Sequence, residues 1–106
     1  MPKYLVRASL TVDGIRGTLK EGGTARKAVV EQLAQSMGSK VEAFYYAFGE
    51  HDLYVIFDAP DNVAIATATT TVAATGIAKV DTVVLITPEE MDQVARKNVT
   101  YRAPGA

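Results

Sequence analysis

Residues 44–57 read FYYAFGEHDLYVIF, two runs of aromatic and aliphatic residues on either side of a short polar turn. Such runs, bounded by Gly and Asp, predict two β-strands joined by a tight connection. A strand with one face in water alternates apolar and polar residues, but here both sets of alternate positions are apolar. Helices of the same chain can cover one face of the resulting sheet. We expect the other face to need a second cover, for which so short a chain has little left.

The same patterns extend to both sides of this hairpin. They predict strands at 4–10, 40–48, 53–59 and 79–86, and helices that end near residues 37, 75 and 97 and begin after the capping residues Thr24, Asp61 and Thr87. Four glycines between residues 11 and 23 predict a loop there. The sequence Thr87-Pro88-Glu89-Glu90 predicts a helix start with a cap, a proline in the first turn and a glutamate three residues after the cap.

The order of these elements is β-α-β-β-α-β followed by a short helix. Two β-α-β units that share one sheet predict an α+β, ferredoxin-like fold: a four-stranded antiparallel sheet with helices on one face and a short C-terminal helix added. We expect one domain over residues 1–97 and a C-terminal tail over 98–106.

The predicted helix over residues 62–75 contains no charged residue, and the charge-free run continues to Ala78. A helix that faces solvent normally shows one charged side. We therefore expect this helix to be largely buried, either at a contact between subunits or beneath the C-terminal tail.

Composition narrows the classes of function. The chain has 106 residues and a net charge of -1, without the basic stripe of a nucleic-acid-binding protein. It has no Cys, which excludes disulfides and thiolate catalysis, and its single His does not favour a metal site. No apolar run approaches the roughly 20 residues of a membrane span, and the N-terminus lacks a signal-peptide core. We expect a cytoplasmic protein without contacts to nucleic acid or membrane.

Two short motifs resemble the GYD domain family, which is named after a Gly-x-Tyr-Asp turn. Here that turn reads Gly49-Glu50-His51-Asp52, so His51 stands where the family has Tyr. The stretch Thr11-Val12-Asp13-Gly14-Ile15-Arg16 is similar to the family's Thr-x-x-Gly-Ile-Arg element. The resemblance covers about residues 4–90 and implies a ferredoxin-like domain of the dimeric α/β-barrel type that self-associates. It brings no established activity with it.

His51 and Asp52 are the candidate catalytic residues, because a carboxylate beside an imidazole can fix its tautomer and raise its pKa. Adjacent residues of a strand point to opposite faces, so the two meet only if the turn brings them together. The competing interpretation, which we favour, is a structural hairpin turn in which Gly49 takes a positive φ and Asp52 accepts backbone hydrogen bonds.

Candidate ligand-binding residues are Arg7 and Ser9 on one face of the first strand, Arg16 in the glycine-rich segment, and Tyr45 among the aromatics of the hairpin. A few polar groups in an apolar pocket are typical of a ligand site. An alternative for Arg7 is a structural ion pair with Asp81, and the glycine-rich segment lacks the spacing of a phosphate-binding loop. The sequence indicates no cofactor and no metal.

The sequence thus predicts a small homo-oligomeric protein that binds a small apolar or aromatic molecule or acts as an assembly module. The alternative is a small cofactor-independent enzyme of the monooxygenase or isomerase type, by analogy with other dimeric α/β-barrel proteins. A regulatory subunit of a larger complex fits the charge-free helix equally well.

Overall fold

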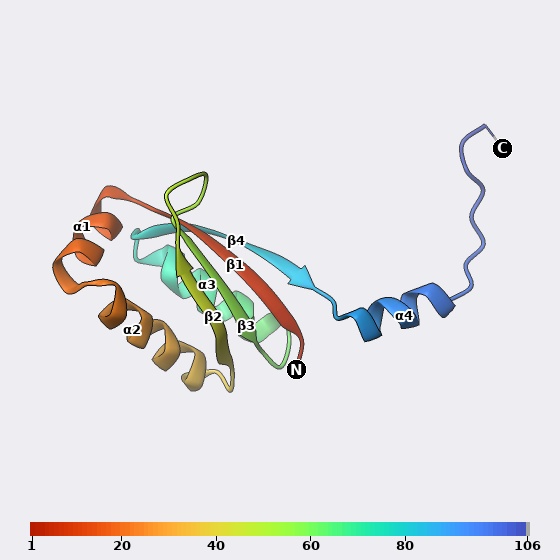
Figure 1. Ribbon diagram of the computed structural model, residues 1–106, viewed down its shortest axis with the longest axis horizontal. Helices are drawn as coiled ribbons and strands as arrows, with labels where there is room; N and C mark the ends of the chain where they lie inside the picture. Colours follow the sequence, from red (N-terminus) through yellow and green to blue (C-terminus); the bar gives the residue numbers. More distant parts are fainter. Residues whose placement is uncertain (106) are drawn as a thin grey trace.

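The computed structural model describes residues 1–105, which form one four-stranded sheet and four helices (Figure 1). The strands are β1 (Lys3–Leu10), β2 (Lys40–Tyr46), β3 (Leu53–Asp58) and β4 (Ala78–Leu85). The helices are α1 (Val12–Glu21), α2 (Gly23–Ser36), α3 (Asn62–Ala74) and α4 (Pro88–Arg96). No helix within the described residues is both long and apolar enough to cross a membrane.

The sheet confirms the predicted ferredoxin-like fold. Its strand order is β2-β3-β1-β4, and every neighbouring pair is antiparallel. The two strands that α1 and α2 connect, β1 and β2, are therefore separated by β3. The two strands that α3 connects, β3 and β4, are separated by β1. Two interlocked β-α-β units produce this order.

The core lies between the sheet and the helices α2 and α3. Tyr4 and Val6 of β1 point into it, and Ala34 of α2 and Ile65 of α3 pack against them. Tyr4 is 2% exposed, and its hydroxyl donates a hydrogen bond of 2.7 Å to the side chain of Asn62, which satisfies the one polar atom that it buries. The predicted alternation of β1 is therefore confirmed.

The prediction of a loop over residues 11–23 is wrong, because α1 occupies most of that segment. Thr11 caps the helix and accepts a hydrogen bond from the backbone nitrogen of Gly14. Gly14 is buried against the segment that leads into β4, and a Cβ at this position would overlap the carbonyl oxygen of Ile77. The glycine allows the helix to approach closely, instead of breaking it.

The β2–β3 connection also differs from the prediction. The second strand ends at Tyr46, and Phe48 is fully exposed in the loop. Gly49 does not take a positive φ, and a Cβ there would meet no atom within 4 Å. The expectation that Gly49 relieves backbone strain is therefore wrong.

Helix α3 has the predicted position, but in the single chain only Ile65 and Ala68 are buried. Three of its four threonine hydroxyls donate to backbone carbonyls one turn earlier, among them Thr67 to Val63 and Thr71 to Thr67, both at 2.7 Å. These hydroxyls are occupied within the helix, so the outer side of α3 displays mainly methyl groups. The expectation that the tail covers this helix is wrong, and burial at a subunit contact stays a prediction.

Helix α4 and residues 97–105 project away from the rest of the chain (Figure 1). Every residue from 88 to 105 is exposed. The radius of gyration is 17.0 Å, whereas a compact chain of this length has about 13 Å. The predicted helix start is confirmed: the Thr87 side chain accepts from the backbone of Glu90, whose carboxylate accepts from the backbone of Thr87.

Candidate functional site

The face of the sheet opposite α2 and α3 is named here the bare face. It carries Leu5, Arg7 and Ser9 of β1 and the residues in register with them on the other strands. Pairing places Leu5 beside Ile56 on one side and Val83 on the other, and Ile56 beside Ala43. One unbroken apolar row therefore crosses all four strands of the bare face.

Ion pairs border this apolar row on both sides. At one end Lys3 contacts Glu42 at 2.6 Å and Asp58 at 2.7 Å. At the other end Arg7 donates two hydrogen bonds to Asp81, at 2.8 and 2.9 Å. The Arg7 guanidinium lowers the pKa of the Asp81 carboxyl. The charges of these five residues are thus paired within the bare face.

The structure brings four of the candidate residues, Arg7, Ser9, Tyr45 and His51, to the bare face. Arg7 lies opposite Tyr54, which lies opposite Tyr45, and Tyr45 is 71% exposed. Ser9 Oγ and His51 Nδ1 are 3.2 Å apart, within hydrogen-bond distance. Arg7 is bound to Asp81 in the structural ion pair that the sequence offered as an alternative. These polar groups form a border instead of converging on a pocket.

His51 and Asp52 contact different groups. His51 reaches Ser9, whereas the Asp52 carboxylate accepts a hydrogen bond of 2.7 Å from the backbone nitrogen of Leu10. The backbone nitrogen of Asp52 also donates to the carbonyl of Ala8, at 2.9 Å. Asp52 therefore fastens the β2–β3 turn to the end of β1. This geometry supports the structural interpretation of the turn.

Arg16 lies apart from the other candidates. It stands on α1 with an exposed side chain, at the end of the sheet where β1 turns into this helix (Figure 1). No interaction within residues 1–105 joins it to Arg7, Ser9 or Tyr45. Arg16 thus has no share in a common site with them.

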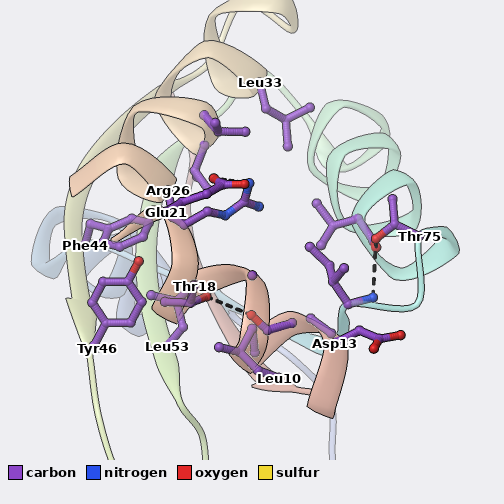
Figure 2. Close-up of a pocket in the computed structure, with 18 residues that line it drawn as sticks. Leu10, Asp13, Thr18, Glu21, Arg26, Leu33, Phe44, Tyr46, Leu53 and Thr75 are labelled. Carbon is purple, nitrogen blue, oxygen red and sulfur yellow. Dashed lines mark hydrogen bonds and ion pairs between the residues drawn. The ribbon is translucent and has the colours of Figure 1, made fainter. Parts of the chain in front are cut away.

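A hollow lies on the other side of the sheet, between α2 and α3 and closed at one end by α1 (Figure 2). This cleft has a volume of about 360 Å³. Its apolar lining comes from six elements and the α3–β4 link: Ala8, Leu10, Val29, Val30, Leu33, Phe44, Leu53, Val72, Ile77 and Ala78 among others. A smaller apolar hollow of about 60 Å³ shares Ala8, Val30, Leu33, Leu53 and Val72 with it.

Polar groups gather where α1 meets α2. Arg26 lies 3.4 Å from Glu21, and Figure 2 shows both side chains in the space between α2 and the sheet. The Tyr46 hydroxyl donates to the carbonyl of Gly23 at 3.1 Å. Burial raises the pKa of Tyr46, and the positive charge of Arg26 opposes this shift. Glu21 and Arg26 are paired with each other, whereas Asp13, which also lines the cleft, forms no ion pair within residues 1–105. The rest of the lining is mainly apolar, which favours a mainly apolar ligand.

A family model for the GYD domain matches residues 4–95 of the chain. The chain belongs to the GYD domain family. No curated protein and no solved structure matches it.

Both motifs of this GYD domain now have a physical role. Thr11 and Gly14 let α1 sit tightly on the segment before β4, and α1 supplies one end of the cleft. Asp52 holds the β2–β3 turn in register with β1. Sequence reasoning missed the cleft and the pair of Glu21 and Arg26. The spacing of Val12, Ile15 and Leu19, at helical intervals after a threonine cap, was the available signal for α1.

Proposed function

We propose that this GYD domain binds a small apolar or aromatic molecule in the cleft between α2 and α3. The observation that carries the proposal is the cleft itself. Its volume of about 360 Å³ lies within the roughly 300–1,000 Å³ of small-molecule sites. Phe44 and Tyr46 form an aromatic wall, with their rings 5.3 Å apart and edge to face. An aromatic ligand can continue this arrangement.

Packing energetics support a ligand in this place. Protein interiors are close-packed, and voids larger than a water molecule are few. Side chains that line an apolar gap lose dispersion contacts on one side, and a molecule that restores those contacts is bound favourably. Val30, Leu33 and Leu53 are only partly buried although they line both hollows.

Thermal melts of the purified chain with neutral probes test this proposal. The probes are indole, 2-naphthol and 1-octanol, and binding to the folded state alone raises the melting temperature. Val72→Phe fills the cleft from α3, where Val72 lines both hollows, and we expect it to abolish the shift. Tyr45→Ala on the bare face is the matched control and keeps the shift. Equal shifts in wild type and Val72→Phe, or none in either, would contradict the proposal.

The alternative, a cofactor-independent enzyme, would need side chains that exchange protons, and the candidates Ser9 and His51 do not line the cleft. Ser9 and His51 are in contact on the bare face, with the sheet between them and the cleft. The binding proposal needs neither residue, so Ser9→Ala and His51→Tyr should leave ligand binding unchanged. Loss of probe binding in these variants would place the ligand on the bare face and favour the enzyme.

We further propose that the chain works as a homo-oligomer. Its accessible surface is 7467 Å², whereas a folded monomer of 11.3 kDa exposes about 5,700 Å². The excess is about 1,700 Å² per chain, or about 3,400 Å² for two copies, within the range of obligate homodimers. Sedimentation equilibrium at micromolar concentration tests this, and a mass of 11.3 kDa would contradict it.

A further inference from the structure

We propose that the C-terminal arm, residues 86–105, of one copy packs on the bare face of a second copy, and that the exchange is reciprocal. The inference rests on the proposed self-association and adds to it the contact that holds the two copies together. Three independent features of the chain lead to it: an unpartnered helix in the arm, an uncovered sheet face, and complementary charges on the two.

Helix α4 is stabilised by its own capping interactions but packs against no other element within the described residues. It has a complete capping box, a proline in its first turn, acidic residues at its start and Arg96 at its end. A helix of nine residues is nevertheless marginal in water without tertiary packing. Met91 and Val94 form one apolar side of α4 with Ala95, and they are 51% and 56% exposed. This stripe fits a contact with another surface.

The bare face offers such a surface. Its apolar row of Ala43, Ile56, Leu5 and Val83 crosses the whole sheet, and α1, α2 and α3 all lie on the opposite side. The ion pairs at both borders can enter an interface without leaving a buried charge unpaired. A helix amphipathic enough to show one apolar stripe can bury it on this row.

Charges on the first half of α4 and on the bare face are complementary, whereas Arg96 and Lys97 at the end of α4 are basic like the lysines of the face. By register and alternation, Lys40 and Lys79 stand at opposite corners of the bare face, and neither forms an ion pair within residues 1–105. Glu90 and Asp92 flank the apolar stripe of α4, and Glu89 is nearby. Acidic groups beside the stripe would therefore meet free lysines at the corners of the face.

The second copy is the occupant that the chain's own geometry favours. The arm leaves β4 and runs away from its own sheet, which gives the molecule its longest extent of 57 Å (Figure 1). Each chain carries one arm and one bare face, so two copies satisfy both surfaces at once. The excess surface of about 1,700 Å² per chain agrees with burial of an arm and its receiving face.

The first test measures assembly of the full chain. Met91→Glu with Val94→Glu removes the apolar stripe of α4 while keeping its cap, and should raise the dimer dissociation constant at least about 100-fold. Gln93→Glu adds a charge on the opposite side of the same helix and should leave the dimer dissociation constant unchanged. A dimer that persists in the double variant overturns the arm contact, although self-association itself would survive.

The second test locates the contact. Because the chain has no cysteine, single introduced cysteines report uniquely. Val94→Cys in one population and Val83→Cys in another are mixed and oxidised, and we expect a disulfide-linked dimer between them. Val63→Cys, at an exposed position of α3, replaces Val83→Cys as the control and should not cross-link. Cross-linking to Val63→Cys, or between two Val83→Cys copies only, would place α3 or a second sheet there and overturn the proposal.

Discussion

Gly14 is the position where one added methyl group should do most harm. Its backbone lies so close to the start of β4 that a Cβ would overlap the carbonyl oxygen of Ile77, and the nearest side-chain atom is the Cβ of Leu10 at 3.4 Å. The obstacle is backbone, which cannot rotate away as a side chain can. Overpacking of a well-packed site costs about 1–3 kcal/mol.

Gly17 lies three residues later on the same helix and supplies the control. A Cβ there would meet nothing within 4 Å. Gly→Ala inside a helix is normally stabilising by about 0.5–1 kcal/mol, because alanine loses less backbone freedom on folding. The same substitution on one helix should therefore have opposite signs: Gly14→Ala destabilises and Gly17→Ala stabilises.

Thermal and urea unfolding of the two variants measures this difference. We expect Gly14→Ala to lower the melting temperature by about 5–15 °C, since 1 kcal/mol corresponds to about 4–8 °C in a domain of this size. Gly17→Ala should melt at or above the wild-type temperature. Equal effects at both positions, or a harmless Gly14→Ala, would refute the close approach of α1 to the segment before β4.

The remaining predictions concern the β2–β3 turn and the bare face. Asp52→Ala should cost about 1–3 kcal/mol in urea unfolding, because it leaves a backbone N–H of β1 without its acceptor; a neutral result would contradict the fastening role. His51→Tyr, which restores the family residue, and Gly49→Val, which meets open space, should both change the melting temperature little; a large loss for either would show a packing role in the turn. Arg7 lowers the pKa of Asp81, so this pair stabilises the fold above the unfolded carboxyl pKa of about 3.9 and loses that effect as pH falls through the lower folded value. Melts of Asp81→Asn should accordingly fall below wild type at pH 7 and converge with it at strongly acidic pH; a constant difference would contradict the linkage.

Most of the fold could be predicted because strands and capped helices carry local signals. The alternation of β1 and the apolar hairpin at 44–57 predict which residues lie on each face of the sheet. The capping residue Thr87 indicates the start of α4. These signals depend on residues close in sequence, so they can be recognised in a single amino-acid sequence.

Helix α1 was missed for a reason of tertiary structure. Glycine has a poor intrinsic helix propensity, so four glycines between residues 11 and 23 indicate a loop. Position 14 of this helix is glycine because its contact with Ile77 leaves no room for a side chain, and that contact joins residues far apart in the chain. Propensity is overridden by packing at such a position.

The cleft could not be predicted from the sequence for a similar reason. Its existence depends on the distance between α2 and α3, which pack near opposite edges of the sheet and leave the strands between them partly uncovered. Phe44 and Tyr46 were identified as aromatic strand residues, but no local pattern shows that they border an empty space. Arg7 and Asp81, in contrast, were correctly placed on one face because alternation and strand order determine their register.

The threonine hydroxyls of α3 also have a consequence for motion. Threonine and valine are weak helix formers, and a hydroxyl bound to its own backbone gives the helix no tie to a neighbour. Helix α3 should therefore open locally at a lower free energy than the central strands, and its amide hydrogens should exchange with deuterium well before those of β1. Since α3 forms one wall of the cleft, a molecule bound there would slow that exchange. Local opening of α3 would also give the molecule access to the cleft.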